Sequence, residues 1–163
     1  VTIWFNAVVR GDVHFIKIGN RTNVQDNSCL HTLNGKAPII LGDDVTIGHS
    51  VTLHGCEVHD GALVGMGATV LDHAIVGKGA IVAAHSLVLS NTVIGEGELW
   101  AGVPAKFIKK YNHLKICLNL VRFKTKALVY HSLILNSNTL QYDNSYYNSD
   151  GEHYVCSSNF YFV

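Results

Sequence analysis

The chain has 163 residues, enough for one ordinary domain with a hydrophobic core, and 48% of them are apolar. Its 12 Lys and Arg balance 12 Asp and Glu, so charge does not favour nucleic acid or an anionic membrane as a partner. No apolar run approaches the ~20 residues of a membrane span. The four cysteines stand far apart without a Cys-x-x-Cys pair, which favours free thiols in a reducing compartment.

The beginning of the sequence bears on where the protein works. It shows no basic-then-apolar leader and no initiator Met, so it is consistent with a start inside a longer gene product. We expect a cytoplasmic protein, or an organellar one if an N-terminal segment is missing.

The composition changes near Pro104. Fourteen of the 15 Gly precede residue 106, and all seven Tyr follow residue 110. Up to Ala105 there are 5 basic and 9 acidic residues, and after it 7 basic and 3 acidic, so the net charge changes from 5 − 9 = −4 to 7 − 3 = +4. This pattern predicts two regions, a Gly-rich body over 1–105 and a Tyr- and Asn-rich tail over 106–163.

The body is an internal repeat of six residues. Aliphatic residues recur at Val58, Val64, Val70, Val76, Val82, Val88 and Ile94, most are followed four positions later by a small residue, and Gly often comes directly after them. A period of six is neither helical nor simply alternating, and it is typical of a parallel β-helix whose short strands are joined by tight corners. Gly is expected there because it allows unusual backbone angles. The pattern therefore predicts an all-β fold of roughly five coils, each of three hexads, over residues 1–105.

Three departures from the period set the register of the lower coils. Val9 to Ile18 has three extra residues, Leu30 to Leu41 has five extra in the loop Thr32–Pro38, and Leu53 to Val58 is one residue short. The first residues of the hexads then sort onto three faces. Face A carries Ile18, Leu41, Val58, Val76 and Ile94; face B carries Ile3, Val24, Ile47, Val64, Val82 and Trp100; face C carries Val9, Leu30, Leu53, Val70 and Val88.

The register places chemistry-bearing side chains in columns. Arg10, His31 and His54 hold the second places of successive hexads on face C, so His31 and His54 can share a ligand. On face B, Asp26 holds a third place and His49 holds the same place one coil further on. A neighbouring molecule that presents face B against face C could supply His49, and a threefold arrangement closes such head-to-tail contacts. Three imidazoles with one open position are the ligands of a catalytic zinc-type site, so the spacing suggests a metal site at each interface of a trimer.

The other seven histidines are most simply surface or corner residues. His73 and His85 hold fourth places, where a turn could use a residue that tolerates the left-handed conformation.

Several motifs identify a family. They are Arg10-Gly11-Asp12, Asn23-Val24-Gln25-Asp26, Leu30-His31-Thr32, Ile47-Gly48-His49-Ser50, Leu53-His54-Gly55, Gly65-Met66-Gly67-Ala68-Thr69 and the run Glu98-Leu99-Trp100-Ala101-Gly102-Val103-Pro104-Ala105. Over about residues 1–110 the chain resembles the γ-class carbonic anhydrases. The resemblance implies a left-handed β-helix homotrimer with three interfacial zinc sites, or iron or cobalt in place of zinc.

The resemblance also assigns roles. It implies that His31 and His54 come from one subunit and His49 from the next. A divalent ion lowers the pKa of its bound water to ~7, so that hydroxide attacks CO2 and bicarbonate leaves. Gln25 is suited to orient the bound water. Arg10 can hold bicarbonate while Asp12 and Asp26 orient its guanidinium group, although Arg10 and the two Asp are equally well explained as a structural intersubunit salt bridge.

Two positions depart from the best-studied branch of that family. Val13 and His14 follow Asp12, and Leu33 and Asn34 follow His31-Thr32, where that branch carries proton-relaying Glu residues. Two further functions therefore stay open: a metal-bearing structural or assembly subunit with little turnover, and a hexapeptide acyltransferase that uses acetyl-CoA. The acyltransferase predicts one catalytic His in an interface cleft, for which His85 is a weak candidate, and no three-His metal set.

The tail departs as well. Residues Ala105 to Phe123 could begin an amphipathic helix, since Phe107, Ile108, Tyr111, Leu114 and Leu118 have helical spacing. Beyond Thr125 the pattern dissolves into Ser, Asn and Tyr and predicts no element. Because the repeat closes earlier, we expect deletion of the residues after Thr125 to leave the trimer and its metal intact.

Overall fold

The structure is a computed structural model that describes residues 1–111, 145–147 and 153–155. The chain divides into two units, Val1–Leu120 and Val121–Val163. In the second unit, β18 (Ser145–Tyr147) pairs antiparallel with β19 (His153–Val155). The truncation point Thr125 lies outside the described residues, and the division at residue 105 stays a prediction.

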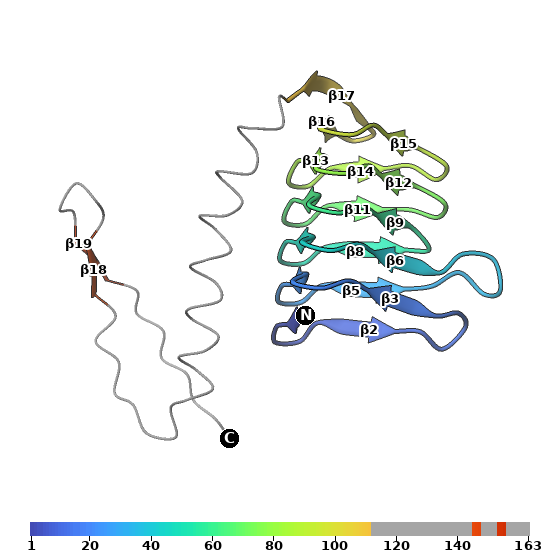
Figure 1. Cartoon of the computed structure of the whole chain (residues 1–163), viewed down its shortest axis with the longest axis horizontal. Helices are drawn as coiled ribbons and strands as arrows, with labels where there is room; N and C mark the ends of the chain where they lie inside the picture. The colour runs from blue at the N-terminus through green and yellow to red at the C-terminus, as the bar shows by residue number, and fades with distance from the viewer. Residues whose placement is uncertain (112–144, 148–152, 156–163) are drawn as a thin grey trace. The chain divides into compact units, whose positions relative to one another are not determined.

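Residues 2–102 form the predicted left-handed parallel β-helix (Figure 1). The strands of face B are β1 (Thr2–Ile3), β4 (Asn23–Val24), β7 (Thr46–Ile47), β10 (Leu63–Val64), β13 (Ile81–Val82) and β16 (Glu98–Gly102). Those of face C are β2 (Val8–Arg10), β5 (Cys29–His31), β8 (Thr52–His54), β11 (Thr69–Val70) and β14 (Leu87–Val88). Those of face A are β3 (Ile16–Ile18), β6 (Ile39–Leu41), β9 (Glu57–Val58), β12 (Ile75–Val76) and β15 (Val93–Ile94). Each strand pairs with its counterpart one coil away, so the predicted faces are confirmed.

The core is a column of first-place side chains from the three faces. Val64, Val70 and Val76 are fully buried, as predicted, and the small fifth-place residues Ala62 and Ala68 are buried beside them. Since the interior of a triangular coil narrows at its corners, only a small side chain fits there. The interior is therefore wholly occupied by side chains, and chemistry has to take place on the outer faces.

Two cysteines belong to this body, and both are free thiols, as expected. Cys56 fills a small-residue corner position, and its burial raises the pKa of the thiol to about 12. Cys29 is half-buried in β5. Cys117 and Cys156 lie outside the described residues.

The corners use the left-handed backbone conformation at one fixed place in the repeat. His73 and His85 have φ of 58° and 55°, which confirms the expectation for these fourth-place residues. The glycines that directly follow the aliphatic residues are needed for a different reason, which the sequence did not indicate. A Cβ on Gly65 would lie 2.6 Å from the backbone nitrogen of Ala84 on the next coil, so Gly is needed there for close approach of two coils.

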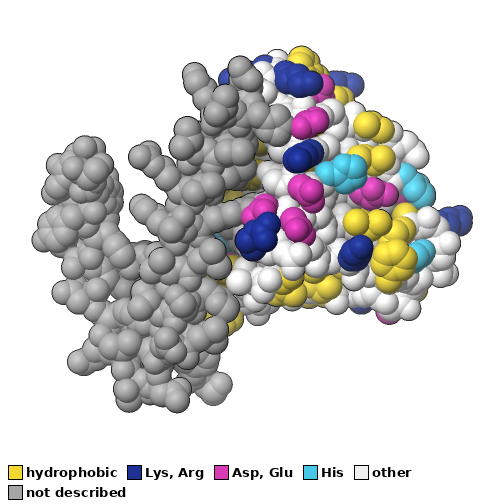
Figure 2. Space-filling model, viewed as in Figure 1, with side chains coloured by type: hydrophobic (Ala, Val, Ile, Leu, Met, Phe, Trp, Pro, Cys, Tyr) yellow, Lys and Arg dark blue, Asp and Glu magenta, His cyan; other side chains and the backbone are white. Residues whose placement is uncertain are grey.

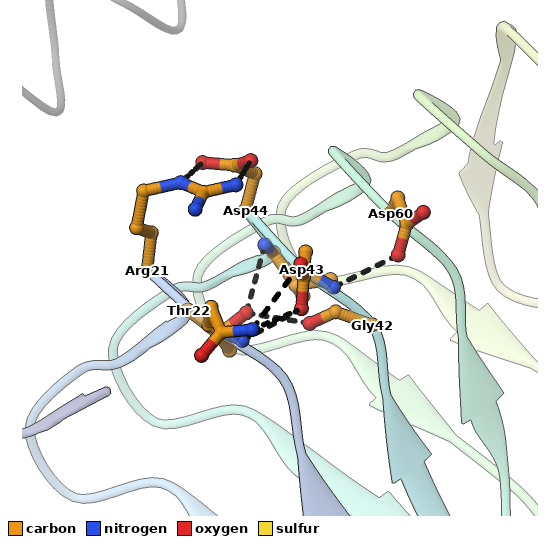
Figure 3. Close-up of polar contacts among 8 residues, drawn as sticks. Arg21, Thr22, Gly42, Asp43, Asp44 and Asp60 are labelled. Atoms are coloured by element: carbon orange, nitrogen blue, oxygen red, sulfur yellow. Dashed lines mark hydrogen bonds and ion pairs between the residues drawn. The ribbon is translucent and has the colours of Figure 1, made fainter.

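One corner, between faces A and B, carries a column of acidic side chains. The Asp43 carboxylate accepts a hydrogen bond from the backbone N–H of Asn20 (2.7 Å), and Asp60 accepts one from Asp43 N–H (2.8 Å) (Figure 3). Arg21 forms a two-bond ion pair with Asp44. Figure 2 shows acidic and basic side chains gathered together on the face that it displays. The Asp43 and Asp60 carboxylates cap backbone N–H groups and the Asp44 carboxylate pairs with Arg21, so this column has a structural explanation.

The end of the β-helix corrects one prediction. Residues Ala105–Lys110, expected to begin a helix, form the strand β17, which pairs antiparallel with β16 (Figure 1). The last coil leaves the N–H and C=O groups of β16 without a further coil, and a strand that turns back at Gly102–Pro104 satisfies them. The rest of the expected helix, beyond Tyr111, lies outside the described residues. Among the described residues no helix could span a bilayer.

Candidate metal centre

The departures from the six-residue period collect at one corner, between faces C and A. The extra residues after β2 and β5 form two loops that meet there, where Gly35 N–H donates to Val13 C=O (3.3 Å) and the Thr32 hydroxyl donates to His14 C=O (3.4 Å). The shortened hexad after β8 lies at the same corner, one coil above. The loops thus flank the end of the strands that carry Arg10, His31 and His54.

His31 and His54 lie side by side on the outer surface of face C. They are register partners in β5 and β8, which lie on adjacent coils (Figure 1). Their ring centroids are 5.1 Å apart, and His31 Nδ1 faces His54 Nε2 at 3.1 Å. The structure therefore brings together the pair of histidines that the sequence placed in one ladder.

Each of these rings has a carboxylate at its other nitrogen. His31 Nε2 lies 3.1 Å from Asp12 Oδ1, and His54 Nδ1 lies 2.5 Å from Asp72 Oδ1. A carboxylate accepts hydrogen bonds, so in the neutral tautomer that donates to its carboxylate each ring has a lone pair on the opposite nitrogen. Both lone pairs then point into the space between the two rings.

This arrangement fits a metal ion. The two facing nitrogens are 3.1 Å apart, and nitrogens bound to one tetrahedral ion at ~2.0–2.1 Å would be roughly 3.3 Å apart, so an ion fits between the rings with little movement of either. Neutral imidazoles held by carboxylates are the usual ligands of zinc, iron and cobalt. The donor set is thus suited to a divalent transition metal.

Arg10 and Asp12 continue the same polar chain. Arg10 NH1 donates to Asp12 Oδ2 at 2.6 Å, while Asp12 Oδ1 contacts His31. The Arg10 guanidinium group holds the pKa of the Asp12 carboxyl below its usual range, helped by the hydrogen bond to His31 and opposed by partial desolvation. Half of the Asp12 side chain is exposed, so this pair faces the solvent next to the histidines.

His49 lies on a different face. It follows β7, at the corner that leads from face B to face C, and its Nδ1 is 2.9 Å from Asp26 Oδ2. About half of its side chain is exposed. Within the described part of one chain, no three His, Cys, Asp or Glu side chains gather into a metal-binding group. One chain thus supplies two facing imidazoles on face C and a separate, Asp-paired imidazole at the edge of face B.

Gln25 is half-buried directly after β4 on face B. Its amide nitrogen donates to Asn23 Oδ1 at 3.3 Å. Asp26 contacts His49 within the chain rather than Arg10. The structure therefore divides the sequence-predicted residues into two groups: Arg10, Asp12, His31 and His54 on face C, and Gln25, Asp26 and His49 on face B.

Asp72 was missed by sequence reasoning. It follows β11, one coil above His54, and nothing in its own hexad distinguishes it from other corner residues. The available signal was the shortened hexad after Leu53, because it changes which residue of the next coil lies beside His54.

Comparisons with known proteins bear on the family of this chain. The model of the family described as bacterial transferase hexapeptide (six repeats) matches residues 55–90. The chain is 52% identical to a protein of Arabidopsis thaliana named gamma carbonic anhydrase 1, mitochondrial, over 67% of this chain, but it spans only 42% of that protein's length. It is 50% identical to a probable carbonic anhydrase of Methanocaldococcus jannaschii, over 71% of this chain and 72% of that protein.

A solved structure extends the likeness to three dimensions. The crystal structure of a hexapeptide transferase family protein from Anaplasma phagocytophilum has 41% sequence identity and a TM-score of 0.72. The match covers 78% of this chain and 74% of that one.

Proposed function

This chain belongs to the γ-class carbonic anhydrase family, and we propose that it is a metal-dependent carbonic anhydrase that interconverts CO2 and bicarbonate. The observation that carries the proposal is the pair of imidazoles facing each other at 3.1 Å, each held from behind by an aspartate. A divalent cation bound there, Zn2+ or otherwise Fe2+ or Co2+, supplies the activation of water near neutral pH. The remaining steps depend on residues of the chain.

The site requires a second subunit. One chain presents His31 and His54 on face C, and its His49 lies at the edge of face B. A homotrimer that places face B of one subunit against face C of the next completes three such sites, since head-to-tail contacts close with threefold symmetry. In that assembly Asp26 orients the imidazole of His49 as Asp12 orients that of His31.

The other residues bind and orient the reactants. Arg10, fixed by Asp12, presents guanidinium N–H groups that can hold the bicarbonate oxygens. Gln25 lies on face B together with His49, so it reaches the site from the neighbouring subunit, where its amide can hold a water molecule in place. Arg10 and Asp12 also contribute an ion pair at the interface, and the two roles are compatible.

A metal-bearing assembly subunit with little turnover is the second candidate. The two loops that flank the site, residues 11–15 and 32–38, contain Asp12 as their sole acid, and that carboxylate is bonded to Arg10 and His31. His14 accepts a hydrogen bond from Phe15 N–H through Nδ1 (2.9 Å). Rapid hydration needs a group that exports the proton, and these loops provide no free carboxylate for this purpose.

The acyltransferase alternative is less well supported. It needs a catalytic His in a cleft, but His85 holds a left-handed corner position, and its ring packs over Gly67, with ring atoms 2.5 Å from where a Cβ would be. The same measurement of metal content that tests the main proposal also tests this alternative, which requires no metal.

The test is metal analysis combined with a CO2 hydration assay. We expect the purified protein, loaded with zinc, cobalt or anaerobic iron, to hold one metal per interface and to hydrate CO2. Arg10→Ala and Gln25→Ala should keep the metal and lose the activity. Bound metal without hydration by any of the three ions would favour the assembly subunit, and a metal-free protein would end both proposals. A cytoplasmic or organellar location suits either function, and the plant relative carries the word mitochondrial in its name.

A further inference from the structure

The shortened hexad after Leu53 has a consequence for the site. In a regular hexad the left-handed residue holds the fourth place, as Ser50 does after Ile47 and Gly61 does after Val58. In the shortened hexad Gly55 has φ of 53° and follows His54 directly, so the third-place residue is the one that is missing. The corner that follows His54 is therefore one residue shorter than the other corners.

Asp72, on the next coil, lies beside this shortened corner. Its Oδ1 atom lies 2.5 Å from His54 Nδ1, and a Cβ on Gly55 would come within 2.8 Å of the same oxygen. The backbone is fixed at this point as well, because His73 N–H donates to Gly55 C=O at 2.7 Å. Both the missing residue and the missing Cβ therefore make room for one carboxylate beside one ring nitrogen.

Other aspartates at equivalent corners do something else. Asp43 and Asp60 lie over Gly19 and Gly42 in the same way, and their carboxylates accept backbone N–H groups (Figure 3). At the shortened corner the carboxylate is directed at an imidazole instead. The difference lies in the length of the hexad one coil below. Gly19 and Gly42 directly follow the first-place aliphatic residue of a complete hexad, whereas Gly55 follows His54, the second-place residue of the shortened hexad.

We propose that Asp72 is a positioning residue for the metal site, which holds His54 with Nε2 turned toward His31. This inference rests on the proposed function and deepens it. Asp72 accepts the hydrogen on Nδ1, so the ring is fixed in one tautomer and one orientation, and the Nε2 lone pair stays available as a ligand. Only about a quarter of the Asp72 side chain is exposed, which limits competition by water.

The proposal distinguishes Asp72 from a surface carboxylate that happens to meet a histidine. Glu57 and His59 provide the comparison: they form the same kind of pair, at 3.2 Å, on face A, with nearly half of each side chain exposed. Neither belongs to the site. Glu57→Gln is therefore a matched control, because it removes a carboxylate from an imidazole one coil below Asp72 without touching the proposed ligands.

The experiment compares the affinity of the full chain for Co2+ by competition with a chelator, together with the visible spectrum of the bound ion. Asp72→Ala should lower the affinity about 10- to 100-fold and alter the spectrum, while Glu57→Gln leaves both unchanged. Asp72→Asn keeps an oxygen that can accept from Nδ1, so its loss should be smaller than that of Asp72→Ala. If Asp72→Ala does not fold, the isosteric Asp72→Asn carries the test, with a measurable loss still expected.

The possible failures are distinguishable. If the unmodified chain binds no Co2+, the proposed function fails and this inference fails with it. If the unmodified chain binds Co2+ and Asp72→Ala and Asp72→Asn bind it equally well, Asp72 has no positioning role, although the metal site stands. An equal loss in Glu57→Gln would likewise overturn the role assigned to Asp72.

Discussion

The two halves of the β-helix differ in regularity and in chemistry. From Val58 to Trp100 the six-residue period has no interruption, and the hexapeptide family model matches within 55–90. Below Val58 the period is broken three times, and every residue assigned to the site except Asp72 lies there. Each break follows a strand of face C that carries Arg10, His31 or His54 in its last position. The regular half thus provides the scaffold, and the irregular corner carries the candidate site.

The largest effect should come from breaking the scaffold. Val64→Asp places a carboxylate in a fully buried position without a partner, which should destabilise the fold by more than about 3 kcal/mol. Chemical denaturation should show a large fall in the free energy of unfolding, with metal lost as a consequence. A Val64→Asp variant as stable as the unmodified chain would contradict the buried column.

The irregular half should respond in the opposite way, by losing metal and keeping the fold. In His54→Ala two imidazoles remain per interface, and such a site holds zinc poorly. We expect metal content to fall to nearly zero, with the free energy of unfolding of the metal-free protein changed by about 1 kcal/mol or less, because the side chain points outward. His59→Ala, on face A, is the control and should keep the metal.

Restoring the regular hexad length at the irregular corner should separate the stability of the coil from its affinity for metal. Insertion of one Ala between His54 and Gly55 restores the six-residue hexad and moves Gly55 to the fourth place. The coil should be retained, while Asp72 is displaced from His54 and metal affinity falls about 10-fold or more. Circular dichroism and chelator competition measure the two effects. Unchanged affinity would mean that the missing residue has no bearing on the site.

The smallest effect concerns the corners of the regular half. Gly61 has φ of 67°, and no atom lies within 4 Å of a Cβ built there, so Gly61→Ala introduces backbone strain alone. It should cost ~1–2 kcal/mol. Asn91→Gly, at the same place of another hexad with φ of 61°, relieves such strain and should be neutral or slightly stabilising. Thermal unfolding should therefore show a lower Tm for Gly61→Ala and an equal or higher Tm for Asn91→Gly. An unchanged Tm for Gly61→Ala would contradict the predicted backbone strain.

The fold could be predicted from the sequence because the repeat fixes which side chains point inward. Once the phase was followed through the two insertions and the deletion, the three faces followed by counting, and all of them are confirmed. The strand Ala105–Lys110 was wrongly expected to be helical, because apolar spacing over a short stretch does not reveal an unpaired strand edge at the last coil.

The site could be predicted only in part. Residues in one column, such as His31 and His54, come together by register alone, and the structure places them in contact. Contacts between corner residues of adjacent coils depend on the local backbone and on which side chain reaches the neighbouring coil. Asp72 reaches His54 because a residue is absent and Gly55 lacks a Cβ, which are local features that a count of hexads does not resolve.

The central claim is that each metal site is shared between two subunits, and a subunit-mixing experiment tests it most directly. His49→Ala and His54→Ala chains carrying different affinity tags are co-expressed, and trimers that contain both are purified. Neither variant alone should hold metal. In any mixed trimer one interface joins face C of a His49→Ala chain to face B of a His54→Ala chain and is complete, so about a third of the full metal content should return. Mixed trimers without metal, or His49→Ala trimers with full metal, would contradict the shared site.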